Sequence, residues 1–78
     1  MEIFEKLKGI IAEELPNVDA GSISMDSRFK EDLQCDSLDV AQIVVAIEDV
    51  FSIEIPLDAT TSIRTVGEAV EAIRKAVG

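Results

Sequence analysis

Residues 37–51 read SLDVAQIVVAIEDVF, and this stretch decides the fold. Its apolar side chains recur at intervals of three and four residues, the spacing that brings them to one face of an α-helix. The predicted core stripe of this helix consists of Val40, Ile43, Val44, Ile47, Val50 and Phe51. Asp36 is predicted to cap the N-terminus of the helix, and Asp39 to stabilise the positive end of its dipole. The stretch therefore predicts an amphipathic helix with one face in a helical core.

Helical periodicity also appears near both ends of the chain. Residues 2–15 form the first predicted helix, which Pro16 ends because it disfavours helical geometry at Leu15. Thr65 and Glu68 form a predicted capping box that opens a last helix. The apolar residues of that last helix are Val66, Ala69, Val70, Ile73 and Val77. Only one short helix fits into residues 57–63, so we predict an all-α fold: a small four-helix bundle with three longer helices and one short helix, in a single domain over residues 1–78.

A long loop follows the first helix, over residues 17–34. It contains scattered apolar residues that we expect to anchor it to the core, since a loop of this length in a small domain is usually pinned or functional. These anchors are Val18, Ile23, Met25, Phe29 and Leu33. The segment 53–55 has the composition of a strand, but nothing else in the chain is suited to pair with it.

The charge distribution limits the kinds of partner. Sixteen acidic residues against seven basic ones give a net charge of −9 at pH 7, and residues 31–63 contain no Lys or Arg. This argues against binding of nucleic acid and of anionic membranes, and favours partners with basic patches.

A single Cys excludes a disulfide-built scaffold, and no apolar run reaches the ~18–20 residues of a membrane span. The start of the chain also lacks the pattern of a signal peptide. We therefore expect a cytoplasmic monomer.

Catalytic machinery is not evident in the sequence. The chain has no His, no Gly-rich phosphate-binding loop and no carboxylate spacing typical of a calcium loop. Ser37 thus has no histidine to activate it as a nucleophile. We predict that the protein is not an enzyme, with neither catalytic residues nor a metal site.

The predicted outer face of the helix over residues 37–51 combines apolar and acidic side chains. It consists of Leu38, Ala41, Gln42, Val45, Glu48 and Asp49. Exposed apolar residues within a polar rim are typical of partner-binding surfaces, although isolated surface apolar residues are also common. Likewise, Asp36-Ser37-Leu38-Asp39 could be only the start of a helix or could mark a functional site.

The same residues carry a resemblance to a known family. Asp36-Ser37-Leu38 resembles the signature of the acyl carrier proteins at the start of their second helix. Residues 29–33, 46–51, 53–56 and 63–67 resemble, in the same order and spacing, further landmarks of that family. The chain is similar to freestanding carriers of type II fatty-acid or polyketide synthesis.

The resemblance implies that a phosphopantetheinyl transferase (holo-carrier synthase) attaches 4′-phosphopantetheine from CoA to Ser37. The arm would carry acyl intermediates as thioesters in fatty acid biosynthesis, in exchange with acyl transferases, ketosynthases and other acyl-processing enzymes with basic patches. The implied partner-binding residues are Asp36, Leu38, Asp39, Gln42, Val45, Glu48 and Asp49. The implied lining for the acyl chain is Phe29, Val44, Ile47, Ile55, Ile63, Ala69 and Ile73.

The chain departs from the family pattern before Ser37. Gln34 and Cys35 replace the usual Gly and small residue, and a left-handed backbone at Gln34 would cost about 1–2 kcal/mol. Cys35 is interpreted as a small apolar plug, with a redox role as the alternative, and Gln42 stands where an acid is common.

Two other functions stay open: a specialised carrier of polyketide, aminoacyl or other acyl groups, and an acidic helical adaptor without a prosthetic group.

Overall fold

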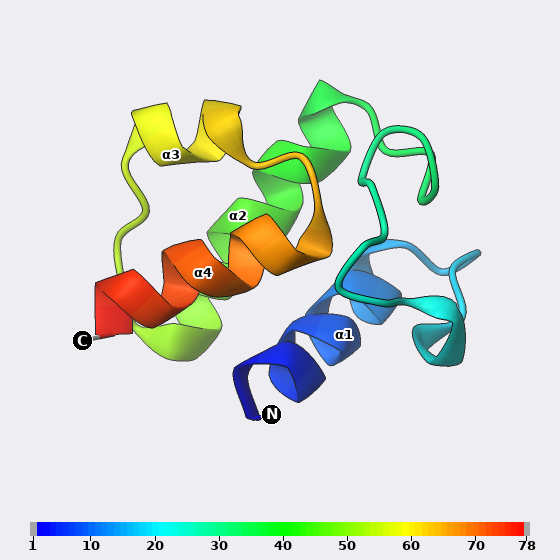
Figure 1. Cartoon of the computed structure of the whole chain (residues 1–78), viewed down its shortest axis with the longest axis horizontal. Coiled ribbons are helices and arrows are strands. Elements are labelled where there is room, and N and C mark those ends of the chain that lie inside the picture. The colour runs from blue at the N-terminus through cyan, green and yellow to red at the C-terminus, as the bar shows by residue number, and fades with distance from the viewer. Residues whose placement is uncertain (1, 78) are drawn as a thin grey trace.

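Within residues 2–77, four α-helices and one 3₁₀-helix follow one another (Figure 1). The computed structural model describes residues 2–77; Met1 and Gly78, and the side chain of Leu57, lie outside the described parts. The elements are α1 (Glu2–Glu14), η1 (Ala20–Ser22), α2 (Ser37–Phe51), α3 (Leu57–Ser62) and α4 (Val66–Val77). Residues 2–77 contain no β-strand, segment 53–55 included. The predicted all-α architecture, with three longer helices and one short helix, is confirmed.

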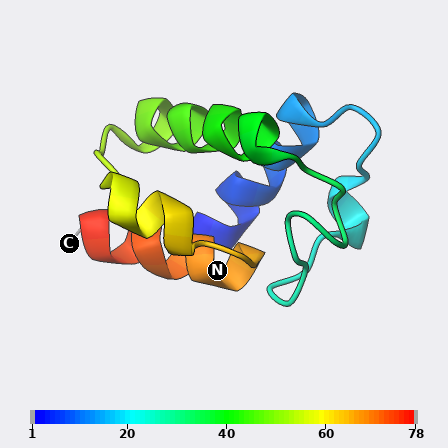
Figure 2. The same cartoon turned by 90° about the horizontal axis from the view of Figure 1, so that it is seen from above.

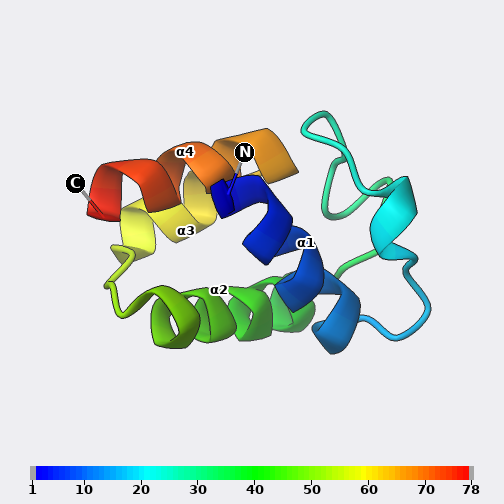
Figure 3. The same ribbon diagram turned by 90° about the horizontal axis from the view of Figure 1, so that it is seen from below.

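The core lies where α1 meets its two helical neighbours. Helix α1 packs against both α2 and α4. Figures 2 and 3 show α2 on one side of the molecule, α3 and α4 on the other, and α1 crossing between them. The largest fully buried side chains are aliphatic: Leu7, Ile11, Ile43, Ile47, Val66 and Ile73. The three longer helices therefore meet in one aliphatic core.

The loop between α1 and α2 is anchored as predicted. Ile23, Phe29 and Leu33 are buried, while Val18 and Met25 pack against the core from a half-buried position. Apolar anchoring thus gives this long connection a fixed course.

Backbone hydrogen bonds join the same loop to the start of α4. The Phe29 N–H donates to the Arg64 carbonyl at 3.0 Å, and the Val66 N–H donates to the Ser27 carbonyl at 2.9 Å. The Gly67 N–H donates to the Met25 carbonyl at 2.8 Å. These bonds hold residues 25–29 against the junction of α3 and α4.

Val50 was predicted to belong to the core stripe of α2 but is exposed, and in this the sequence interpretation was wrong. Val77, an apolar residue of the last helix, is exposed as well. Val50 is 54% exposed and Val77 is 50% exposed. Both lie in the last turn of their helices, at the edge of the bundle, where helical spacing continues but the packing neighbours end. The rest of the α2 stripe is buried or half-buried.

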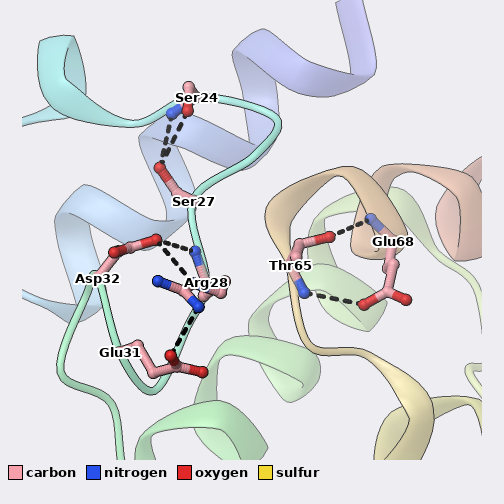
Figure 4. A network of polar contacts seen from close by, with 7 residues as sticks. All are labelled: Ser24, Ser27, Arg28, Glu31, Asp32, Thr65 and Glu68. Carbon is pink, nitrogen blue, oxygen red and sulfur yellow. Dashed lines mark hydrogen bonds and ion pairs between the residues drawn. The ribbon is translucent and has the colours of Figure 1, made fainter.

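The predicted capping box at α4 is present (Figure 4). The Glu68 N–H donates to Thr65 Oγ1 at 3.2 Å, and the Thr65 N–H donates to Glu68 Oε1 at 3.0 Å. The Glu68 carboxylate also accepts a hydrogen bond from the Arg64 N–H at 2.8 Å. The backbone N–H groups of Arg64, Thr65 and Glu68 therefore all have side-chain acceptors at this junction, which fixes the start of α4.

Candidate functional site

Ser37 is the first residue of α2 and is exposed. A reciprocal capping box holds it there: the Asp39 N–H donates to Asp36 Oδ1 at 2.9 Å, and the Asp36 N–H donates to Asp39 Oδ2 at 3.3 Å. The prediction of Asp36 as N-cap is confirmed. Because the two carboxylates bind each other's backbone, they fix the first turn of α2 and leave the Ser37 side chain at the surface.

The first turn of α2 suits a phosphate on Ser37. The capping box occupies the Asp39 N–H, whereas the N–H groups of Ser37 and Leu38 have no acceptor within the helix. These donors and the positive end of the helix dipole favour an anion attached at the Ser37 hydroxyl. The residues present therefore fit a phosphodiester at this position.

The segment that leads into Ser37 alternates between the core and the solvent. Leu33 and Cys35 are buried, with exposed fractions of 8% and 5%, while Gln34 is exposed. Gln34 has a φ of 57°. The left-handed backbone that was considered for this position, where the family usually has Gly, is therefore present. The loop keeps this backbone because burial of the flanking side chains and the bond from the Cys35 N–H to the Phe29 carbonyl, at 2.8 Å, offset the strain.

Cys35 is the buried apolar plug that was predicted. Burial raises the pKa of its thiol, and the negative charges of Asp39 and Asp36 raise it further. The thiol therefore stays protonated in the ordinary pH range, and its side chain acts as a small hydrophobic residue.

The predicted partner face of α2 is largely exposed. Leu38 and Val45 are 65% and 64% exposed, and Gln42 and Asp49 are exposed beside them. Two exposed apolar side chains thus lie among polar and acidic ones on one side of the helix.

Glu48, another acid of that face, has a structural contact. It is half-buried, and its Oε2 accepts a hydrogen bond from the Ile55 N–H at 2.7 Å. This bond ties the segment after α2 back to the helix. Glu48 therefore has an intramolecular role that the helical pattern did not reveal.

A groove with a volume of about 790 Å³ opens beside Ser37. Its walls are the first turns of α2, the end of α3, the start of α4 and residues 28–31 of the loop. The residues that line it are Arg28, Phe29, Lys30, Glu31, Ser37, Val40, Ala41, Thr60, Thr61, Ile63, Arg64, Thr65 and Glu68.

The predicted acyl lining only partly coincides with this groove. Phe29 and Ile63 line it, whereas the other five predicted residues are buried in the core. Those five are Val44, Ile47, Ile55, Ala69 and Ile73. The sequence interpretation missed the hydroxyl and cationic residues of the groove, although the paired threonines at 60–61 and the bases that flank the acidic segment were visible signals.

No helix within residues 2–77 is both long and apolar enough to cross a membrane. In the same range, no three His, Cys, Asp or Glu side chains gather where they could hold a metal ion.

An exposed, capped serine beside a groove is compatible with a covalently attached phosphate group, and comparison with known proteins shows the class to which this four-helix protein belongs. The family described as the phosphopantetheine attachment site matches residues 5–73. An acyl carrier protein of Picosynechococcus sp. (strain ATCC 27264 / PCC 7002 / PR-6) is 49% identical over 77 residues, which cover 99% of this chain and 94% of the relative.

Solved structures of acyl carrier proteins have the same fold. That of Enterococcus faecalis is 32% identical with a TM-score of 0.78, over 96% of this chain and 94% of its own. That of Thermotoga maritima is 29% identical with a TM-score of 0.81, over 92% and 82% of the two chains. The chain belongs to the acyl carrier proteins of the phosphopantetheine attachment family. The predicted carrier function and the predicted phosphopantetheine cofactor are thereby confirmed.

Proposed function

We propose that Ser37 is the attachment residue, and that the chain carries acyl intermediates of fatty acid biosynthesis in the cytoplasm. The observation that carries this proposal is the exposed Ser37 at the capped N-terminus of α2, beside the groove. When bound, the arm supplies a thiol that holds the acyl group as a thioester. The chain itself supplies the hydroxyl, the first turn of α2 and the surfaces around them.

A separate transferase would catalyse the attachment, because the chain has no His to take the Ser37 proton and the carboxylates beside Ser37 are held in the capping box. The two neighbouring carboxylates, Asp36 and Asp39, are occupied by backbone N–H groups. In the attachment step a bond forms between Ser37 Oγ and the phosphorus that bears the pantetheine. The pyrophosphate bond of CoA breaks, the adenosine bisphosphate half leaves, and the serine proton passes to a base of the transferase.

Mass spectrometry of the intact protein tests the attachment. After incubation with CoA and a broad-specificity phosphopantetheinyl transferase, we expect one phosphopantetheine adduct on the unaltered chain and on Ser62→Ala, and none on Ser37→Ala. Ser62 is a matched control because it is an exposed serine at the end of α3. An adduct that persists in Ser37→Ala, or the absence of any adduct, would refute the proposal.

The exposed face of α2 is the proposed docking surface for the transferase and for acyl-processing enzymes. Leu38 and Val45 supply apolar contact. The polar and acidic rim consists of the exposed Asp36, Gln42 and Asp49 and the half-buried Asp39 and Glu48. Basic patches on those enzymes would complement this rim and steer the encounter.

A pair of valine substitutions on one helix tests this surface. Val45 and Val50 have similar exposed fractions, 64% and 54%, but their positions differ by five residues. At 3.6 residues per turn they point about 140° apart. We expect Val45→Asp to slow arm transfer at subsaturating carrier by about tenfold or more, as for a central interface residue, and Val50→Asp to change it little. Equal effects of the two substitutions would contradict the proposed surface.

A further inference from the structure

Met25 contacts the first turn of α4 with both its backbone and its side chain. Its carbonyl accepts the Gly67 N–H at 2.8 Å. Its methyl carbon lies 3.6 Å from the position that a Cβ on Gly67 would occupy, so the side chain folds over this glycine. Met25 is half-buried and packs against the core. One residue therefore holds the loop against α4 in two ways.

The same residue borders the solvent. A second pocket, with a volume of about 540 Å³, opens between residues 25–26, the end of α3 and the exposed side of α4, and Met25 is one of its lining residues. A water-sized oxidant fits easily into a pocket of this volume. Solvent peroxides can therefore reach Met25 while the chain is folded.

The thioether of Met25 is the sulfur that such an oxidant would find. Met25 is the only methionine within residues 2–77. The one thiol, that of Cys35, is 5% exposed and stays protonated, which makes it a poor nucleophile. The two sulfur atoms thus differ in access and reactivity, and Met25 is favoured on both counts.

We propose that Met25 is a site of reversible oxidation by peroxides, and that its sulfoxide loosens the loop from α4. In the forward step a lone pair of Sδ attacks one peroxide oxygen, a sulfur–oxygen bond forms and the O–O bond breaks. The leaving oxygen takes up the proton of the transferred one and departs as water or an alcohol. Methionine sulfoxide reductases, with thiols as the reductant, restore the thioether.

The loosening follows from the polarity of the sulfoxide. Its oxygen requires a hydrogen-bond donor, but ionised carboxylates can only accept hydrogen bonds. The carboxylates that line the pocket are those of Asp26, Glu68 and Glu71. The oxygen therefore depends on water, on the Thr65 hydroxyl or on Lys75, which follows Gly67 by about 12 Å along α4. Water lies on the open side of the pocket, so the sulfur is drawn toward it and away from Gly67.

Peroxide treatment of the unaltered chain and of Met25→Leu tests the proposal. Leucine has a similar volume and cannot be oxidised in this way, so this variant should fold. It retains Met1 and Cys35, and it therefore reports any effect of oxidation elsewhere. Peptide mapping by mass spectrometry locates the added oxygen, which we expect on Met25 of the folded chain.

Thermal unfolding measures the consequence. Loss of the packing of about one methyl group predicts a fall in the melting temperature by about 4–8 °C. Treatment with the two methionine sulfoxide reductases, one for each sulfoxide epimer, should restore the original value. The melting temperature of Met25→Leu should not respond to peroxide.

Amide hydrogen exchange locates the change within the fold. The N–H groups of Val66 and Gly67, which donate to carbonyls of the loop, should exchange faster after oxidation. That of Asp39, in the cap of α2, should exchange as before. The inference would be overturned if Met25 took up no oxygen in the folded chain, if its oxidation left the melting temperature unchanged, or if Met25→Leu showed an equal fall. None of these readouts involves Ser37, so the result is independent of the proposed function.

Discussion

A methyl group at Gly67 should destabilise the protein, and the effect follows from one contact. A Cβ built on Gly67 would lie 2.9 Å from the Met25 carbonyl oxygen, which already accepts the Gly67 N–H at 2.8 Å. The close neighbour is backbone, so relief requires the loop to shift away from α4. Overpacking of this kind costs about 1–3 kcal/mol. Alanine also restricts the unfolded chain, which returns about 0.4–1 kcal/mol.

We therefore expect Gly67→Ala to lower the free energy of unfolding by about 1–2 kcal/mol. For a domain of this size the melting temperature should fall by about 4–16 °C. Thermal and urea unfolding followed by circular dichroism measure both quantities.

Gly9→Ala is the matched control. Gly9 lies within α1, and a Cβ there would meet nothing within 4 Å. This substitution should raise stability by about 0.5–1 kcal/mol, since alanine favours the helix. If Gly67→Ala were as stable as the unaltered chain, or if both substitutions had the same sign, the proposed contact between the loop and α4 would be wrong.

Three further predictions concern polar groups. Glu48→Ala should destabilise the chain by about 1–3 kcal/mol because it leaves the Ile55 N–H without its acceptor, whereas Glu48→Gln should retain most of the stability; urea titration distinguishes the two. Gln34→Gly should be neutral or stabilising by up to about 1 kcal/mol in thermal unfolding, since it relieves the left-handed backbone but loosens the unfolded chain. Hydrogen bonds from the backbone N–H groups of Arg64 and Thr65 lower the pKa of Glu68 below its ordinary value of 4.5. The associated stability should be present above pH 4.5 and be lost as the pH falls through the lowered pKa, and Glu68→Gln should flatten this acid limb of the melting temperature against pH.

Local sequence signals predicted the helices and their starts because the interactions behind them are local. Asp36 with Asp39 and Thr65 with Glu68 are three residues apart, so the chain itself brings each pair together. The helical period similarly identified the buried face of α2. It did not identify the limits of packing, because the period continues to Val50 whether or not a neighbouring helix covers that residue.

Contacts between distant segments were not predictable in the same way. The bond between Glu48 and Ile55 depends on the path of the chain after α2, which a helical wheel does not contain. The groove likewise brings Lys30, from the loop, to the same cavity as Arg64, which precedes α4. The sequence showed bases on both sides of the acidic segment, but only the fold brings them next to Ser37.

Ser37 lies where two surfaces of different charge pattern meet. One is the acidic and apolar face of α2. The other is the groove, which has both cations and acids on its walls: Arg28, Lys30, Glu31, Arg64 and Glu68. A partner with a basic patch would be attracted to the first surface, since residues 31–63 contain acids and no Lys or Arg, and would meet cations at the second, so charge favours its approach from the α2 side. Ala41 belongs both to the outer face of α2 and to the groove, so the two surfaces adjoin along the helix. Under the proposed function, a partner docked on α2 would therefore lie beside the opening of the groove, with Ser37 at the boundary.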